Sequence, residues 1–218
     1  MAPTFPSESP AENGPGPQSE TQAAEQAEAE RTQLLAAARE VLQRSGWWGF
    51  KVESVLRQAG LSTRSFYRHF EKKNDLLLAI LEYQLGVAAD RLRQAAAGAQ
   101  TPSEQIHAWV VAAIRLAYEQ DLAQSATMFA VQLRRLQSEY SEAVERCADL
   151  MRAPLVDAIN DGLASGQFQS EDPVADAKVI YRLVMGMTAD QAALRCPITS
   201  EEIERIVMPF ISRAIERR

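Results

Sequence analysis

The sequence has few of the residues that bind metals or form disulfides, since only two cysteines and two histidines occur among its 218 residues. Cys147 and Cys196 lie far apart, and neither belongs to a Cys-x-x-Cys motif or to a Cys/His spacing that suits zinc. We therefore expect no metal site and no cofactor. The two thiols are expected to be buried and reduced, with a redox switch as the alternative.

Long apolar runs and export signals are also missing. No stretch of eighteen apolar residues occurs, and the chain does not open with a charged segment followed by an apolar one. The sequence thus predicts a soluble, cytoplasmic protein with no membrane partner. Phosphate-binding loops, nucleophile elbows and paired carboxylates are missing too, so we identify no catalytic residue and expect no enzyme.

The chain carries a net charge of −6, but this charge is unevenly distributed. Residues 1–30 contain six acids and no Lys or Arg, and residues 80–218 are acidic as well. Residues 31–79 contain nine bases against four acids, which gives a net charge of +5. Because local charge governs the approach to phosphate, this basic segment is the candidate for binding nucleic acid.

Composition divides the chain into three parts. Residues 1–28 are rich in Pro, Gly, Ser and Glu and hold one large apolar side chain, Phe5, which predicts a disordered acidic tail. Residues 29–79 form a small basic domain, and residues 80–218 form a larger second domain. Apolar residues recur at helical spacing throughout both domains, which predicts an all-α protein.

Helix-start and helix-stop signals predict about nine helices. Thr101-Pro-Ser-Glu104 and Thr199-Ser-Glu-Glu202 fit capping boxes, and Asp172-Pro173 is a third helix start. Pro154 falls inside the longest helix, which should kink or divide there. The expected helices cover residues 31–45, 52–59, a short stretch after residue 62, about 74–98, 102–120, 122–136, 139–165, 173–194 and 200–217.

The basic domain has the pattern of a helix-turn-helix. A short second helix is followed by a turn at Gly60, and Ser62 then caps a third helix whose outer side is polar and basic. Gly46 is expected to end the first helix. Trp47 and Trp48, which follow it, are expected to seal the core of this domain and not to stack on bases.

This segment resembles the DNA-binding domain of the TetR family. The positions that carry the resemblance are Gly46-Trp47, Ala59-Gly-Leu-Ser62, Phe66-Tyr67, His69-Phe70, Lys73 and Leu76-Leu77. Two positions depart from the family pattern, because Lys51 stands where Ser or Thr usually caps the second helix and Leu56 replaces a small residue. The resemblance implies a ligand-responsive regulator that binds palindromic double-stranded operator DNA, most often as a repressor.

The third helix is expected to read the DNA sequence. Its outward residues suit the major groove, and these are Ser62, Thr63, Arg64, Ser65 and Arg68. Arg64 is the best equipped to bind guanine through O6 and N7. The resemblance implies phosphate contacts by Tyr67, His69 and Lys73. Phe66 and Phe70 should be core; the alternative for Arg64, Arg68 and His69 is an ordinary solvated surface.

The last two helices carry apolar stripes that predict a dimer interface. One helix-turn-helix reads only a few base pairs, so specific binding usually requires two. The expected interface residues are Ile180, Val184, Met187, Ile203, Val207, Phe210, Ile211 and Ala214. The resemblance implies a homodimer held by these two helices of each chain. The alternative is that both helices are simply core of one chain.

The resemblance places an effector pocket in the second domain. Large or soft side chains that could line an apolar cavity there are Trp109, Tyr118, Met128, Phe129, Gln132, Met151, Tyr181 and Met185. Ordinary core packing explains each of them equally well. We expect a small, largely apolar effector of unspecified identity. The competing hypotheses are an architectural DNA-binding protein without an effector and a helical enzyme, and an activator stays open beside a repressor.

Overall fold

The computed structural model describes residues 17–118, 138–194 and 198–216. Every regular element in these ranges is a helix, and one isolated bridge joins Phe168 to Glu216. The helices are α1 (Pro17–Gly49), α2 (Val52–Ala59), α3 (Thr63–His69), α4 (Lys73–Ala97), α5 (Pro102–Tyr118), α7 (Ser141–Ala164), α8 (Pro173–Leu194) and α9 (Ser200–Ile215). The all-α prediction is confirmed. The helix expected over residues 122–136 lies outside the described residues.

The predicted capping residues begin three of the helices. The Thr101 hydroxyl accepts the N–H of Glu104 at 3.3 Å, and the Glu104 carboxylate accepts the N–H of Thr101 at 3.1 Å, which is the reciprocal pattern of a capping box. Thr199 accepts the N–H of Glu202 at 3.2 Å, and Asp172 caps α8 in the same way. The starts of α5, α8 and α9 are therefore confirmed.

The extent of two helices differs from the prediction. α1 begins at Pro17 and not near Arg31, so residues 17–28 of the expected disordered tail are helical. Gln, Ala and Glu dominate this stretch, and these residues favour a helix even where it is exposed. Helical geometry breaks at Gly46, where φ is 63°, as predicted. α7 continues through Pro154 as one helix, so it does not divide there.

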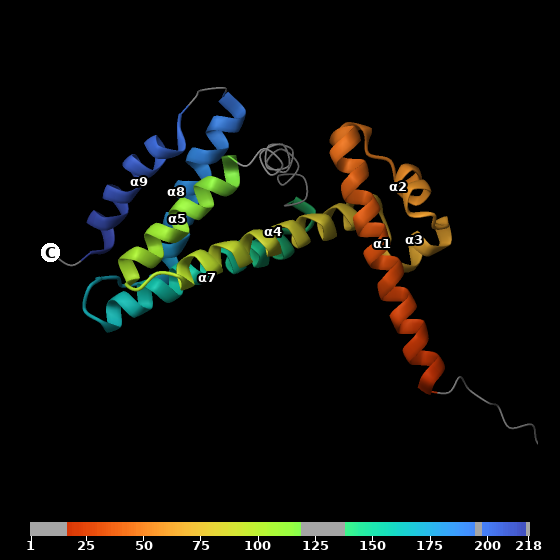
Figure 1. The fold of residues 1–218 in the computed structure, drawn as a ribbon, viewed down its shortest axis with the longest axis horizontal. Coiled ribbons are helices and arrows are strands. Elements are labelled where there is room, and N and C mark those ends of the chain that lie inside the picture. The colour runs from red at the N-terminus through yellow and green to blue at the C-terminus, as the bar shows by residue number, and fades with distance from the viewer. Residues whose placement is uncertain (1–16, 119–137, 195–197, 217–218) are drawn as a thin grey trace, which may run out of the picture.

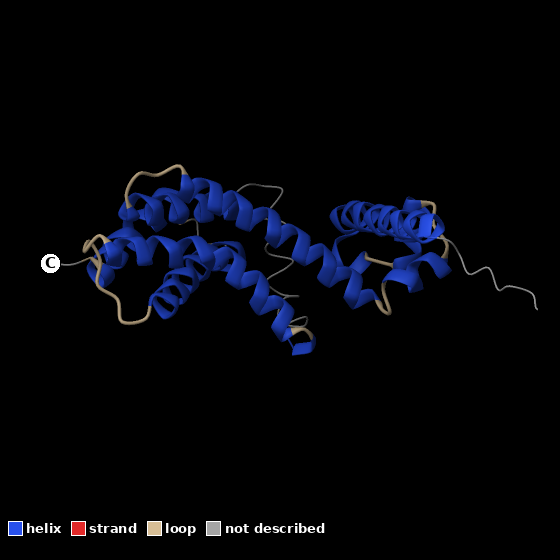
Figure 2. Cartoon of the chain, turned by 90° about the horizontal axis from the view of Figure 1, so that it is seen from below, coloured by secondary structure: helices blue, strands red, loops and turns tan. Residues whose placement is uncertain are grey.

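The described helices enclose two hydrophobic cores. α1, α2, α3 and the first turns of α4 surround an N-terminal core, and the later turns of α4 join α5, α7, α8 and α9 around a C-terminal core. Figures 1 and 2 show α1–α3 gathered at one end of the molecule and α4 running from them to the other end. Within the described ranges, no helix has the length and apolar character needed to cross a membrane.

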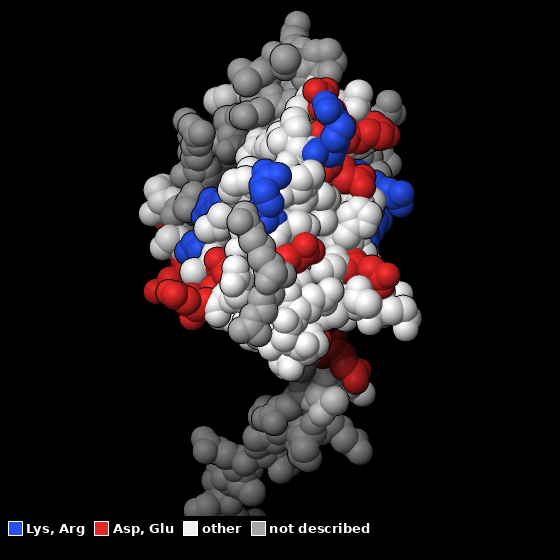
Figure 3. Space-filling model, turned by 90° about the vertical axis from the view of Figure 1, so that its left-hand side faces the viewer, with Lys and Arg blue, Asp and Glu red and all other residues white. Residues whose placement is uncertain are grey.

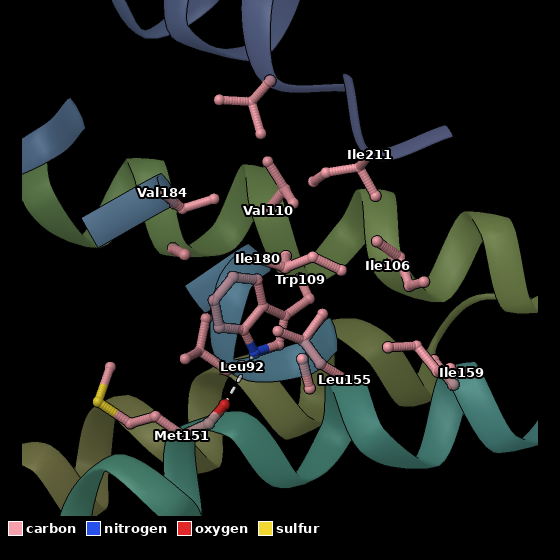
Figure 4. Packing of buried hydrophobic residues seen from close by; sticks show 14 of the residues in the cluster. Leu92, Ile106, Trp109, Val110, Met151, Leu155, Ile159, Ile180, Val184 and Ile211 are labelled. Atoms are coloured by element: carbon pink, nitrogen blue, oxygen red, sulfur yellow. Dashed lines mark hydrogen bonds between the residues drawn. The ribbon is translucent and has the colours of Figure 1, made fainter. Parts of the chain in front are cut away.

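Trp109 lies at the centre of the C-terminal core. It is completely buried, and its indole Nε1–H donates to the carbonyl of Met151 at 3.0 Å (Figure 4). Figure 4 also shows Leu92 and Leu155 beside the indole, so side chains of α4, α5 and α7 meet there. The hydrogen bond satisfies the one donor of the buried indole and anchors α5 to α7.

The far end of the C-terminal core is closed by a tight approach between α7 and the segment after it. Phe168 is buried, and its N–H donates to the carbonyl of Gly162 at 3.0 Å. The N–H of Gln169 donates to the carbonyl of Ile215 at 2.7 Å, which ties this segment to the end of α9. A Cβ atom at Gly162 would lie 1.9 Å from Phe168 Cδ2, so only glycine permits this packing.

We expect Gly162→Ala to destabilise the protein by about 1–3 kcal/mol, because Phe168 must leave its position in the core. Gly86→Ala in α4 is the control, since a Cβ there meets nothing within 4 Å. That control should be neutral or stabilising by up to about 1 kcal/mol. Urea unfolding measures both changes, and equal stability of the two variants would contradict this account of the packing.

Candidate nucleic-acid interface

The turn between α2 and α3 is built by its glycine and by a serine cap. Gly60 has a left-handed backbone with φ of 65°, and the N–H of Leu61 donates to the carbonyl of Leu56 at 3.0 Å. The Ser62 hydroxyl then accepts the N–H of Ser65 at 3.1 Å and so caps α3. These bonds terminate α2 and start α3 within three residues, which is the turn of a helix-turn-helix.

α3 has a buried face and an exposed face at helical spacing. Phe66 and Phe70 are buried in the N-terminal core, with ring centroids 5.8 Å apart. The exposed face consists of Thr63, Arg64, Tyr67 and Arg68. Thr63 lies one helical turn from Tyr67, and Arg64 lies one turn from Arg68. The four side chains therefore form one continuous polar surface that can contact a DNA groove. The prediction that Phe66 and Phe70 are core is confirmed.

Two residues of this domain are not where the sequence predicts. The Ser65 side chain does not face outward, since Ser65 is only 8% exposed and its hydroxyl lies 3.2 Å from that of Ser62. Trp48 is 82% exposed and does not seal the core. Phe50, which is buried, occupies the core at this turn instead, and Lys51 with its extended backbone follows it directly.

Glu30 restrains the C-terminal end of α3. Its carboxylate lies 3.1 Å from Nη1 of Arg68 and 3.4 Å from Nε2 of His69. The His69 side chain is nearly buried by this contact, whereas half of the Arg68 side chain remains exposed. The phosphate contact expected of His69 therefore requires this residue to leave Glu30, and the same carboxylate competes with DNA for Arg68.

Lys73 is also engaged within the protein. Its ammonium donates to the carbonyl of Phe50 at 2.7 Å and lies 5.3 Å from the centroid of the Phe50 ring. Burial lowers the pKa of Lys73, and the charge of Glu53 opposes that shift. Lys73 thus connects the first turn of α4 to the turn before α2 in the DNA-free protein. Its phosphate contact remains a prediction.

The two departures from the family pattern have modest consequences. Lys51 is the N-cap of α2 and its side chain makes no capping hydrogen bond. The loss of such a cap costs about 1 kcal/mol. Leu56 is buried in the N-terminal core, so the larger residue fills space between the helices. Gln33 adds a tie across this domain by donating to the carbonyl of Ala59 at 2.6 Å.

Five of the eight expected dimer residues face the chain's own core. The residues that are almost fully buried within one chain are Ile180, Val184, Ile203, Val207 and Ile211. They cannot also form a surface for a second chain, so these interface assignments are wrong. Phe210 and Ala214 are exposed, and Met187 is partly buried. The sequence stripe marked the core face of each helix, because the face toward the core has the most regular apolar spacing.

The expected ligand residues are distributed through the C-terminal core. Trp109 and Met151 are buried, Tyr181 and Met185 are partly buried, and Tyr118 donates its hydroxyl to the carbonyl of Ile198 at 2.6 Å. Residues outside the described ranges are Met128, Phe129 and Gln132. Trp109 and Tyr181 are neighbours, with ring centroids 6.4 Å apart. A ligand role for these residues remains a prediction.

Two polar groups of the C-terminal domain were not predicted from the sequence. Arg152 on α7 is almost fully buried, and its guanidinium lies 5.6 Å from the centroid of the Tyr181 ring. Tyr140, just before α7, donates its hydroxyl to Asp75 on α4. The burial of Arg152 could have been predicted, because this arginine stands among the apolar positions of α7. No sequence signal predicted the hydrogen bond between Tyr140 and Asp75, because the two residues are 65 positions apart.

At the end of the molecule away from α1–α3, positively and negatively charged side chains are mixed. On the face in Figure 3, described Lys and Arg side chains alternate with Asp and Glu and do not gather into a basic patch. The basic segment of the chain, by contrast, lies in α1–α4 at the other end. A turn of this geometry with a basic exposed helix defines the class of helix-turn-helix DNA-binding proteins.

Comparisons with known proteins identify the family. The model described as "Bacterial regulatory proteins, tetR family" matches residues 34–80, and the model described as "Tetracyclin repressor-like, C-terminal domain" matches residues 102–207. The chain belongs to the TetR family of bacterial regulatory proteins and is a DNA-binding transcriptional regulator. The comparison with curated proteins gave no match.

Solved structures share the fold at low sequence identity. A TetR-family protein from Mesorhizobium loti has a TM-score of 0.72 at 15% identity, over 88% of this chain and 98% of that one. RolR has a TM-score of 0.67 at 17% identity, over 88% and 90% of the two chains. FadR from Bacillus subtilis has a TM-score of 0.66 at 18% identity, over 83% and 96%. The fold therefore extends over both domains.

We expect Arg64→Ala to weaken operator binding by about 1–3 kcal/mol and to relax the preference at one base pair in each half-site. Arg64 is exposed on α3 and has no hydrogen bond or ion pair within the described chain, so its removal leaves the fold intact. Selection from a random DNA pool, followed by titration of the selected site, measures both effects.

The control for this measurement is Arg93→Ala, near the other end of α4, where Arg93 pairs with Asp90 on the surface. That variant should bind the selected site as the unaltered protein does. An unchanged base preference in Arg64→Ala would show that this residue does not read the sequence.

Proposed function

We propose that the protein is a homodimeric repressor that leaves a palindromic operator when a small, largely apolar effector binds its C-terminal domain. The observation that carries this proposal is a polar cluster between the first turn of α4 and the start of α7. α4 follows the DNA-reading helix directly, whereas α7 forms a wall of the C-terminal core. The cluster therefore joins the two regions that an effector must connect.

Five residues form the cluster. Glu139 accepts hydrogen bonds from the ammonium of Lys72 and, at 2.8 Å, from the amide of Asn74. Tyr140 donates its hydroxyl to Asp75, and the Lys72 ammonium lies 5.6 Å from the centroid of the Tyr140 ring. All contacts run between the start of α4 and the two residues that precede α7. A shift of α7 along α4 must break them or move the start of α4.

The ionisation states of the cluster favour these bonds at neutral pH. The hydrogen bond from Lys72 lowers the pKa of Glu139, with a further contribution from Asn74. Burial raises the pKa of Tyr140 to about 12, and its bond to Asp75 adds to the shift. Tyr140 is therefore a protonated donor and Glu139 an ionised acceptor in the physiological range.

Effector binding in the C-terminal domain can act on DNA through this cluster. A ligand that binds better to one arrangement of α7 against α4 shifts the population toward that arrangement. The spacing of the two recognition helices in a dimer then changes, and with it the fit to two operator half-sites. Operator and effector oppose each other by one shared coupling energy, typically about 1–3 kcal/mol.

The second copy of the chain is proposed to cover an apolar face of α8 and α9. Large apolar side chains exposed on these helices include Val179 at 58%, Ile206 at 45% and Phe210 at 52%. A shallow hollow between the helices is lined by Val179, Leu183, Phe210 and Ala214. Two copies that bury this face against each other would place two helix-turn-helix domains on one DNA.

The class of effector is supported by the solved relatives and by the core. FadR from Bacillus subtilis was solved with stearoyl-CoA, and RolR was solved with resorcinol. Both ligands combine an apolar or aromatic part with polar groups. The partly buried Tyr181 and Met185 border the C-terminal core here, and aromatic and thioether side chains suit such ligands.

We expect Phe210→Glu to dissociate the dimer, because a charge on this face would be buried without a partner when two copies meet. Leu150→Glu on α7 is the matched control, since Leu150 is exposed to 49% and lies outside α8 and α9. Sedimentation at micromolar concentration measures both. A monomeric unaltered protein, or a dimer that survives Phe210→Glu, would contradict the proposed interface.

We expect Tyr140→Phe combined with Glu139→Gln to reduce the response to effector, because these changes remove the bond to Asp75, the negative charge that pairs with Lys72, and one of the two acceptor oxygens that Lys72 and Asn74 use. Small apolar compounds are screened for release of a labelled selected operator from the unaltered protein. For each active compound, operator affinity is then measured with and without it. In the variant the coupling energy should fall from about 1–3 kcal/mol toward zero.

Glu142→Gln serves as the control for this variant, since Glu142 is an exposed acid of the first turn of α7 outside the cluster. It should keep the full response. The proposed function is wrong if every compound that binds the unaltered protein leaves operator affinity unchanged.

A further inference from the structure

Arg152 is the one arginine that the described C-terminal core encloses. Its side chain is only 6% exposed, although it is charged at every physiological pH. Nη2 donates to Glu145 at 2.8 Å and also to Asp149, both on α7. The side chains of Glu145 and Asp149 are exposed to 41% and 63%, so both carboxylates lie toward solvent.

The other terminal nitrogen of Arg152 has no partner. Nη1 is buried and makes no hydrogen bond within the described chain. A buried donor without an acceptor is costly, and the cost is larger for a charged group than for a neutral one. Among the described residues, no other buried side-chain nitrogen or oxygen is left in this state. Nη1 of Arg152 therefore lacks one hydrogen-bond acceptor.

The surroundings of Nη1 are apolar and aromatic. The guanidinium lies 5.6 Å from the centroid of the Tyr181 ring, and that ring lies 6.4 Å from the ring of Trp109. The only donor of Trp109 is already used by the carbonyl of Met151. Tyr181 and Met185, one turn apart on α8, are partly exposed.

The unpartnered nitrogen favours an anion over a neutral acceptor. Glu145 is shared, because Lys178 also pairs with it at 3.4 Å, and both Glu145 and Asp149 lie toward solvent on Nη2. Neither carboxylate reaches the buried Nη1. A hydrogen bond from a guanidinium to a charged acceptor is roughly twice as strong as one to a neutral acceptor, so a carboxylate suits this nitrogen best.

We propose that Nη1 of Arg152 binds the carboxylate of a small monoanionic effector whose apolar part lies against Tyr181 and Met185. The inference deepens the proposed function, on which it rests for the role of the ligand as effector. It names the polar group of that ligand and the residue that recognises it. The bond is made by a single nitrogen, since both acceptors on Nη2 are already in place.

Binding is tested by calorimetry on the full-length protein without DNA. The probes are benzoate, 4-phenylbutanoate and octanoate, each paired with its primary amide, which has the same shape without the charge. We expect at least one carboxylate to bind at least tenfold more tightly than its amide. In Arg152→Met this preference should disappear, while the weak binding of the amide persists.

Arg146→Met is the matched control, because Arg146 is an exposed arginine on the same helix. It should keep the preference for the carboxylate. Melting temperature and operator affinity without ligand show that each variant is folded, and Arg152→Gln, which keeps a hydrogen-bond donor without the charge, replaces Arg152→Met if the latter does not fold. The inference is overturned if no carboxylate is preferred over its amide, or if the preference survives the loss of Arg152.

Operator release is measured separately with the same probes, so that the two proposals fail in different ways. Carboxylates that need Arg152 for binding but leave operator affinity unchanged would support the site and contradict the proposed function. Carboxylates that release the operator equally from the unaltered protein and from Arg152→Met would support the proposed function and overturn the site.

Discussion

Helix α4 is part of both hydrophobic cores, and the rest of the structure depends on this sharing. Its first turns bury Leu76, Leu77 and Ile80 against α1–α3, and its later turns bury Ala89 and Leu92 against the C-terminal helices. α4 is one continuous helix of 25 residues. Neither domain can separate from it without opening its own core. The two domains are coupled because their interiors are joined by a single rigid element.

The contacts of α4 outside the two cores also connect the two domains. On one side, the guanidinium of Arg39 on α1 lies 4.7 Å from the centroid of the Tyr83 ring. On the other, Leu81 meets Val144 beside the cluster that contains Tyr140. α4 is therefore held by the first helix of the DNA-binding domain and by the start of α7. A displacement at either end has contacts through which it can reach the other.

Local signals in the sequence predict local features well. Capping residues set the starts of α5, α8 and α9, and the glycine and serine of the α2–α3 turn predict both its position and its bonds. Which residues of α3 are exposed is harder to predict. Ser65 is small and polar, and its burial depends on the hydroxyl of Ser62. The apolar stripe of α9 marks Val207 and Ile211 correctly as apolar, but periodicity cannot tell a chain's own core from a partner.

Contacts between distant segments determine how the exposed face of α3 can act. Glu30 belongs to the acidic N-terminal part of the chain and lies 38 residues from Arg68, yet its carboxylate restrains both Arg68 and His69. DNA must therefore displace a protein carboxylate to bind Arg68 and His69, and the gain from each of these contacts is offset by the lost ion pair. Arg64 has no such competitor within the described chain, so it retains its full capacity to bind a base. Glu30 thus opposes one residue expected to read bases, Arg68, and one expected to contact phosphate, His69, whereas the contact expected of Arg64 is opposed by neither of these ion pairs.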